Sequence, residues 1–359
     1  MSQAIAIDTS DISAAALAAD PDRALEDGEV RVTIERFALT ANNVTYAAFG
    51  EAMGYWAFFP SADGSGRLPV WGFATIAESR ADGVETGERI YGYFPAAETA
   101  VLRPVGARPE SFIDGAPHRA QLPAAYNRYV RCAGDPGYRP ELEAAQMVLQ
   151  PLFVTSFLID RHLRDEAMSG AGVVSLTSAS SKTALALAHL LAEDKPEGVR
   201  LEALTSAGNR GFVAGLGYFD DVVVYDDIET MDDRAARVIV DFAGDHDLTR
   251  RLHARLGDSL KRNIRVGGAH WEKSAPPSDL PGPKPVFFFA PDHARDRIAE
   301  WGAEAFAQRY QSAWLAFARD AAGLFEFEAR QGMEGALSAY RDLVANRVPG
   351  RKALTIELG

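Results

Sequence analysis

The stretch AGVVSLTSASSKTALALAHLL, residues 171–191, decides the fold of this chain. It opens with a short apolar run that contains the β-branched pair Val173 and Val174, as a buried strand does. It closes with an Ala- and Leu-rich run of high helix propensity. Small, hydroxyl-bearing residues at 177–183 form a tight turn between them. A strand, a tight turn and a helix bring backbone N–H groups and a helix N-terminus to one point, and that arrangement holds a phosphate.

The turn lacks the glycines that let the backbone of a dinucleotide-binding loop approach the pyrophosphate. Thr177, Ser180 and Thr183 stand at the corresponding spacing. Two interpretations stay open: a nucleotide-binding turn, or an ordinary strand–turn–helix unit whose Ser and Thr cap the helix. A Walker-type loop is disfavoured because Ser181-Lys182-Thr183 lacks both flanking glycines. Lys182 meets the pyrophosphate on the first interpretation and is a solvated lysine at a helix start on the second. The candidate cofactor-binding residues of the turn are Ser178, Ser180, Ser181, Lys182 and Thr183.

The residues that follow the next predicted strand, 199–204, indicate which cofactor is used. In a dinucleotide-binding sheet an acidic residue at this place binds the ribose hydroxyl of NAD, whereas an Arg accommodates the additional phosphate of NADP. Residues 205–216 contain no acid and offer Ser206, Asn209 and Arg210 instead. This pattern predicts NADP(H) as the cofactor. The alternative for Arg210 is a solvated helix residue.

Composition narrows the class of protein. The 359 residues are 47% hydrophobic and 24% charged, as in ordinary globular proteins, and the net charge is −13. That charge disfavours nucleic acid and anionic membranes as partners, so a small-molecule substrate is expected. Cys132 is the only cysteine, which excludes a disulfide within the chain and a cysteine-rich zinc site. We find no apolar segment of membrane-spanning length and no signal peptide, so we expect a cytoplasmic protein.

Two patterns divide the chain. From residue 171 onward, strands alternate with helices, which predicts a parallel sheet covered on both faces. Its strands are expected at 173–176, 200–204, 221–225, 237–241, 263–266 and 286–289. Before it, short strands separated by Gly and Pro turns predict a β-rich domain, with strands at 29–39, 68–79, 88–94 and 101–102. Residues 1–27 show no clear strand. The other expected elements are a helix at 140–163 with a break at Pro151, a long helix at 295–322, a strand at 324–328, a helix at 335–346 and a last strand at 352–358.

Several loose motifs follow one another in the order known from one superfamily. They are Asn42-Asn43-Val44, VETGERIYG at 84–92, GLGYFDDVVVY at 215–225, DFAG at 241–244, and the closing helix and strand at 335–358. In this order and spacing the chain resembles the zinc-independent medium-chain dehydrogenase/reductase superfamily, the quinone and enoyl reductase group. Asn42-Asn43-Val44 resembles the Asn-rich turn of its enoyl-thioester reductases. The turn at 177–183 stands where the group has its glycine loop.

The resemblance implies an α/β fold with two domains. A GroES-like β-rich domain would comprise residues 1–149 and 326–359, because the last strand returns to the first domain. A Rossmann-type doubly wound parallel sheet would comprise residues 150–325. The implied activity is NADPH-dependent reduction of an activated C=C bond (an enone or enoyl thioester), a quinone or a carbonyl. Relatives are often dimers, which makes a homodimer a possible assembly. The alternative is a non-redox or binding protein that kept the fold and lost dinucleotide binding with its glycines.

The chain departs from the zinc-binding members of the superfamily. These have a Cys in the first domain, a Gly-His-Glu and a later Cys. Here Trp71-Gly72-Phe73 stands near the place of Gly-His-Glu, and the early turn has no Cys. We therefore expect no metal site.

Reduction without zinc needs a hydride from NADPH and a protein group that protonates the product or stabilises its developing charge. Tyr46 lies on the turn that resembles the active-site turn, with Asn43 and Thr45 beside it, so these three are the candidate catalytic residues. The alternative for Tyr46 is a core tyrosine. The aromatic loop at 55–59 predicts an apolar or aromatic substrate. The remaining candidates are Tyr55, Trp56, His270 and Trp271 for the substrate, and Tyr225, Phe242, Gly267, Gly268 and Phe289 for the cofactor. For the residues at 267–271, which follow the fifth strand, the alternative is an exposed loop.

Overall fold

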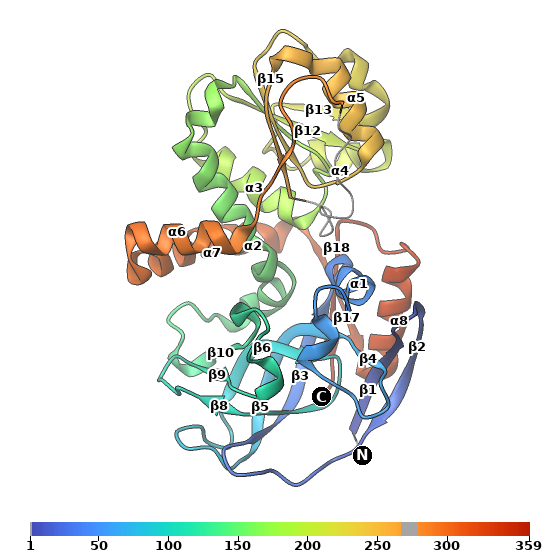
Figure 1. Cartoon of the computed structure of the whole chain (residues 1–359), viewed down its shortest axis with the longest axis vertical. Coiled ribbons are helices and arrows are strands. Elements are labelled where there is room, and N and C mark those ends of the chain that lie inside the picture. Colours follow the sequence, from blue (N-terminus) through green and yellow to red (C-terminus); the bar gives the residue numbers. More distant parts are fainter. Residues whose placement is uncertain (1, 267–278) are drawn as a thin grey trace. The chain divides into compact units, whose positions relative to one another are not determined.

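The computed structural model describes residues 2–266 and 279–359. The chain divides into two compact units, coloured along the sequence in Figure 1. Met1–Pro151 and Phe325–Gly359 make up the β-rich unit, and Leu152–Leu324 make up the parallel-sheet unit.

The parallel-sheet unit is built on six parallel strands in the order β13-β12-β11-β14-β15-β16. Their bounds are β11 Val173–Leu176, β12 Arg200–Thr205, β13 Asp221–Val224, β14 Arg237–Asp241, β15 Leu260–Arg265 and β16 Val286–Phe287. Counted within the unit, this is the order 3-2-1-4-5-6 of a dinucleotide-binding fold. The predicted doubly wound parallel sheet is therefore confirmed.

Burial explains why these short strands form. Every residue of β11 is buried, because helices cover both faces of a parallel sheet. Helix α3, Lys182–Glu193, lies on one face, and α5, His246–Leu256, lies on the other (Figure 1). The residues of α3 from Ala184 to Leu191 are all buried, so its Ala- and Leu-rich sequence packs directly on the strands. The turn at 177–183 is thereby held between two buried elements.

Two predictions for the end of this unit are wrong. The long helix expected at 295–322 is two helices, α6 Ala290–Trp301 and α7 Ala303–Leu324, because Gly302 adopts a left-handed φ of +80° between them. The core strand expected at 286–289 is the two-residue edge strand β16. Val286 is 52% exposed and Phe289 is 53% exposed. A short apolar run has the same composition in a central strand and in an edge strand, so the sequence did not separate them.

Helix α2, Glu143–Asp165, runs through Pro151 without the predicted break. A proline inside a helix costs about 3 kcal/mol or more through its missing N–H and its ring. Burial of apolar residues on both sides of it, among them Val148 and Phe153, offsets this cost. The residues Pro140–Asp165 also meet the length and hydropathy of a membrane span, contrary to the sequence-based expectation, and 61% of the apolar window is buried inside the protein.

The β-rich unit holds a nine-stranded sheet. Its path is β17-β18-β3-β5-β6-β10-β9-β8, and β7 pairs with β3. The bounds are β3 Val30–Leu39, β5 Pro69–Ser79, β6 Arg89–Pro95, β7 Thr99–Leu102, β8 Pro104–Val105, β9 Ser111–Asp114, β10 Arg128–Arg131, β17 Glu326–Gln331 and β18 Lys352–Glu357. The last strand, β18, pairs antiparallel with β3 and so joins the two ends of the sequence in one sheet. Between β3 and β5 lie helix α1, Ala41–Ala48, and the 3-10 helix η1, Tyr55–Phe58.

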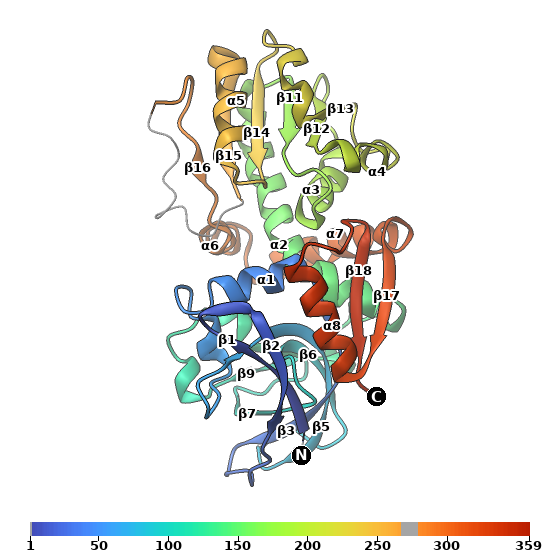
Figure 2. The same cartoon turned by 90° about the vertical axis from the view of Figure 1, so that its right-hand side faces the viewer.

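Residues 1–27 do contain strands, which the sequence analysis missed. Strands β1, Ser2–Asp8, and β2, Asp11–Asp20, form an antiparallel hairpin, and β1 also pairs with β4, Gly66–Arg67. The hairpin packs against helix α8, Gly332–Val344 (Figure 2). Its alanines have low strand propensity, so burial of residues such as Ile5 and Ile7 in the core of the unit stabilises it.

Candidate functional site

The centre of the parallel sheet carries a polar network where the strand order reverses. Thr177 directly follows β11, and Asp241 ends the neighbouring strand β14. The Thr177 hydroxyl donates to Oδ1 of Asp241 at 2.6 Å, and it accepts from the backbone N–H groups of Phe242 and Ala243 at 2.9 and 3.0 Å. In open α/β sheets, ligands bind in the crevice at this reversal of strand order.

The turn after Thr177 is held by hydrogen bonds instead of glycines. Ser178 has a φ of +48°, a left-handed conformation that costs a residue other than glycine about 1–2 kcal/mol. Its backbone N–H donates to the Tyr225 hydroxyl at 2.9 Å, and the N–H of Ala179 donates to the Leu204 carbonyl at 3.1 Å. Leu204 on β12 and Tyr225, directly after β13, thereby fix the turn in one shape.

Helix α3 begins at this turn with a cation in its first position. The hydroxyl of the N-cap residue Ser181 accepts from the Ala184 N–H at 3.3 Å. Lys182, the first helical residue, is half-buried, and desolvation lowers the pKa of its ammonium group to about 8. A positive charge is unfavourable both in low dielectric and at a helix N-terminus, and an anion placed there would offset both effects. Thr183 is half-buried, and its carbonyl accepts from the Ser156 hydroxyl.

A second polar group stands at the end of β12. The side-chain amide of Asn209 donates to the hydroxyl of Ser180 at 3.0 Å and to that of Ser206 at 3.2 Å, which joins this turn to the first one. Arg210 begins helix α4, Arg210–Ala214, and is exposed. Within the described ranges its guanidinium has neither a hydrogen bond nor an ion pair, so it is available to an anion.

The structure brings most, but not all, of the predicted cofactor residues together. Ser178 contacts Tyr225, Ser180 contacts Asn209, and Phe242 contacts Thr177 through its backbone. Phe289 is instead an exposed residue at the start of α6. The predicted residues Gly267, Gly268, His270 and Trp271 lie outside the described residues.

Tyr46 lies in an aromatic cluster of the β-rich unit. The buried members of this tyrosine cluster are Tyr46, Tyr55, Phe58 and Tyr93, and Phe59, Trp71, Leu122 and Tyr126 pack against them. Ring centroids of Tyr46 and Tyr55 are 4.5 Å apart, and those of Tyr93 and Tyr126 are 4.7 Å apart. Burial, reinforced by the nearby Tyr55, raises the pKa of Tyr46 above its ordinary value. The phenol therefore keeps its proton throughout the neutral range.

The two residues predicted beside Tyr46 differ in their surroundings. Asn43 is buried, and its side-chain oxygen accepts from the Thr40 N–H at 2.7 Å as part of the capping box of α1. Its amide donates to the Pro69 carbonyl at 2.8 Å, so one end of the side chain caps α1 and the other holds α1 against β5. Thr45 lies one residue before Tyr46 on α1 and is half-buried.

The predicted substrate residues Tyr55 and Trp56 lie on η1. Tyr55 is a buried member of the tyrosine cluster. Trp56 packs against the core, and a Cβ atom added to Gly50 would lie 2.1 Å from its indole ring. Gly50 is therefore needed for the close approach of the backbone to Trp56. In the part of the chain that the structure describes, no group of three His, Cys, Asp or Glu side chains could hold a metal ion.

Residues 37–349 match the family described as "Protein of unknown function (DUF2855)". The chain belongs to this family. Among curated proteins, none matches the sequence.

Solved structures show which fold this DUF2855 protein has. It is similar to CurA from Vibrio vulnificus in complex with NADPH, with 13% identity, a TM-score of 0.59 and 99% coverage of each chain. It is similar to the yhdH oxidoreductase from Salmonella enterica in complex with NADP, with 14% identity, a TM-score of 0.56, and coverage of 99% of this chain and 100% of that one. The quinone oxidoreductase from Coxiella burnetii matches at 14% identity and a TM-score of 0.56, over 100% of this chain and 99% of that one. The chain shares the fold of these three structures, and this α/β fold is the one that the sequence analysis predicted.

Sequence reasoning missed part of the tyrosine cluster. Tyr93 on β6, Trp71 on β5 and Tyr126 are separated in sequence from Tyr46 and carry no shared spacing. Tyr93 is fully buried, and its hydroxyl has no hydrogen-bond partner among the residues that the structure describes. The alternating pattern of β5 and β6 predicts buried positions, but it does not show that aromatic rings from both strands meet the ring of Tyr46.

Proposed function

We propose that this protein is an NADP(H)-dependent oxidoreductase that reduces an activated C=C bond, a quinone or a carbonyl without zinc. The observation that carries the proposal is the polar turn at the reversal of strand order, where Thr177 and Asp241 meet. The likeness in fold to structures solved with NADPH and with NADP supports it.

The residues around this turn fit a dinucleotide with an additional phosphate. Lys182, the N-terminus of α3 and the hydroxyls of Ser180 and Ser181 would hold the pyrophosphate. Arg210 would pair with the ribose phosphate of NADP(H), because a guanidinium binds phosphate through two parallel hydrogen bonds. When bound, the nicotinamide supplies the hydride.

The proton chemistry is assigned to the β-rich unit. We assign to Tyr46 the role of donor, from its hydroxyl, to the substrate carbon or oxygen that gains charge during reduction. The phenol is protonated at neutral pH, and because burial raises its pKa, donation of a hydrogen bond is favoured over complete transfer of the proton. The aromatic rings of Tyr55 and its neighbours in the tyrosine cluster support an apolar or aromatic substrate.

A fluorescence titration with NADPH and with NADH tests the cofactor assignment. We expect NADPH to bind more tightly than NADH. Loss of nicotinamide absorbance in the presence of enones, enoyl thioesters and quinones then identifies the substrate class. Equal affinity for the two cofactors would reject the role of Arg210.

One observation favours a second candidate function. The N–H of Ser178 donates to the Tyr225 hydroxyl, so a backbone donor that could face a pyrophosphate is already used. This supports a binding protein that kept the fold and lost the cofactor. Absence of binding of both nicotinamide cofactors would favour this candidate over the reductase.

Association into a homodimer stays a prediction, which sedimentation analysis tests.

A further inference from the structure

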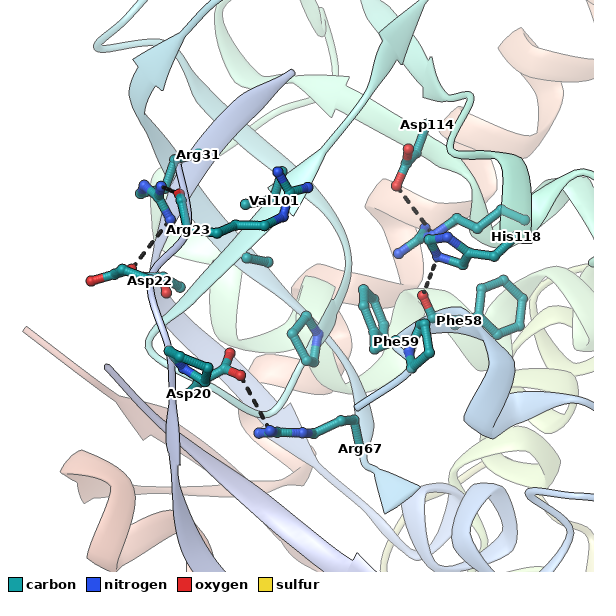
Figure 3. Close-up of a pocket in the computed structure, with 16 residues that line it drawn as sticks. Asp20, Asp22, Arg23, Arg31, Phe58, Phe59, Arg67, Val101, Asp114 and His118 are labelled. Atoms are coloured by element: carbon teal, nitrogen blue, oxygen red, sulfur yellow. Dashed lines mark hydrogen bonds and ion pairs between the residues drawn. The ribbon is translucent and has the colours of Figure 1, made fainter. Parts of the chain in front are cut away.

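The β-rich unit contains a pocket of about 320 Å³ whose lining includes Phe58 and Phe59 of the tyrosine cluster but none of the residues assigned to catalysis or to the cofactor (Figure 3). It lies at the low end of the volumes of small-molecule sites. The apolar part of the pocket wall includes Phe58, Phe59 and Pro60. Charged side chains form much of the remaining wall. In Figure 3, Asp20 and Arg67 lie at one end, and Asp114 and His118 lie at another. A mixed lining of this kind suits a ligand with one charged group and an apolar body.

One of the two buried arginines of the pocket, Arg119, has several partners, although its Nε makes no hydrogen bond within the described residues. Arg119 is 2% exposed, and its Nε lies 3.1 Å from Oδ2 of Asp114. Its Nη1 donates to the Tyr129 hydroxyl at 3.2 Å, and its guanidinium lies 4.5 Å from the centroid of the Phe59 ring. Arg119 therefore shapes and rigidifies the wall beside Phe59.

The other buried arginine, Arg67, has far fewer partners. It is 7% exposed, and its ion pair is a single contact of 3.2 Å between Nη2 and Oδ1 of Asp20. Nη1 is shielded from water and has no hydrogen-bond partner within residues 2–266 and 279–359. A guanidinium carries five donors, and burying them without acceptors is unfavourable. A ligand carboxylate that displaced the Asp20 carboxylate would offer one oxygen to Nη2 and the other to Nη1.

We propose that this pocket binds a small organic carboxylate and that Arg67 recognises its carboxylate group. A planar carboxylate matches the guanidinium fork through two parallel hydrogen bonds. Asp20, Asp22 and Asp114 of the lining are paired with Arg67, Arg31 and Arg119, so the pocket carries little uncompensated positive charge to hold a dianion such as phosphate. The rings of Phe58 and Phe59 favour an apolar or aromatic body on the carboxylate. The inference goes beyond the proposed function and does not depend on cofactor binding.

Isothermal titration of the purified full chain with benzoate at low ionic strength tests the proposal. Benzyl alcohol keeps the ring without the charge, and inorganic phosphate keeps a charge without the ring. We expect benzoate to bind at least about tenfold more tightly than either, the scale of hydrogen bonds to a charged group. Phosphate binding as tightly as benzoate, or no benzoate binding, would overturn the proposal.

Two variants place the ligand at Arg67. Arg67→Met keeps most of the apolar stem and should weaken benzoate binding at least about tenfold, whereas Arg128→Met, at an exposed position of β10, should leave it unchanged. Asp20→Asn removes the carboxylate that competes for Arg67, so it should strengthen binding severalfold. The Asp20→Asn variant tests the carboxylate site even if Arg67→Met does not fold. Unchanged or weaker binding in Asp20→Asn, or full binding in Arg67→Met, would contradict the assignment.

Discussion

Thr177 and Asp241 join the ends of the two central strands of the parallel sheet, through a hydrogen bond of 2.6 Å from the Thr177 hydroxyl to Oδ1 of the carboxylate. Both residues are buried. The same carboxylate oxygen accepts from the N–H groups of Ala243 and Gly244 at 3.0 and 3.2 Å. This network fixes both turns at the reversal of strand order, where residues 177–183 contain no glycine.

The network predicts that Thr177→Val destabilises the protein. The change is nearly isosteric, but it leaves the Phe242 N–H without its acceptor and the Asp241 carboxylate short of one donor. Each such loss costs about 1–3 kcal/mol, which urea unfolding measures. Thr177→Ser, which keeps the hydroxyl, is the control and should retain most of the stability. Equal stability of the Val variant and the wild type would show that the network contributes nothing.

Arg210 should decide between the two nicotinamide cofactors. Because Arg210→Ala removes the cation expected to meet the ribose phosphate, it should weaken NADPH binding by roughly 2 kcal/mol and leave NADH binding nearly unchanged. Titration of both cofactors measures this. Arg234→Ala, at a residue of the same unit whose side chain is 93% exposed, should change neither affinity. An equal loss of affinity for NADPH and NADH would show that Arg210 does not recognise the ribose phosphate and has a general role in the fold.

Lys182 should make NADPH binding pH-dependent. Its pKa of about 8 means that the ammonium group is charged at pH 7 and loses its proton as the pH rises through 8. NADPH affinity should therefore fall between about pH 7.5 and 9 in the wild type, and Lys182→Met should bind more weakly with a flatter pH profile. Identical pH profiles for the two proteins would exclude a contact of Lys182 with the phosphates.

The same shift in the pKa of Lys182 predicts an opposite effect on stability. The unfolded chain holds the proton to about pH 10.4, so the folded state is penalised for carrying the charge at lower pH. Stability from this group should therefore be lowest below pH 8 and should rise from pH 8 to about 10.4. Lys182→Met should raise the Tm at pH 7, and this gain should shrink across that interval. Calorimetry measures it, and a gain independent of pH would point to packing instead of charge.

Tyr46→Phe should bind NADPH normally and slow reduction about a hundredfold or more, because it removes one donor to the oxygen or carbon that gains charge. Turnover is measured with the substrate found by screening, under conditions where chemistry limits the rate. Tyr340→Phe is the matched control: it removes a buried hydroxyl of the same unit that donates to the Ile12 carbonyl at 2.8 Å, and it should keep full turnover. Full turnover of Tyr46→Phe would make Tyr46 structural, with the proton coming from water, as quinone reduction permits.

The sequence by itself determined the parallel sheet and the turn that follows its first strand. Strands such as β11 and β14 are fully buried between helices. Buried strands of this kind are short, mostly apolar runs, so the local sequence is enough to predict them. The turn between β11 and α3 could also be placed, because a strand and a helix flank it. Its standing as a cofactor site stays a prediction, since small hydroxyl residues serve equally well as caps.

Only the tertiary structure decided the elements whose stability comes from distant partners. The hairpin β1–β2 depends on β4 and α8, and α2 continues through Pro151 because its apolar residues are buried. Tyr46 meets Tyr93 and Tyr126 only when three separate segments fold together, and the same holds for Arg67 and Asp20. Sequence periodicity tells which side of an element is buried, but the partner on that side is set by packing between residues far apart in the chain.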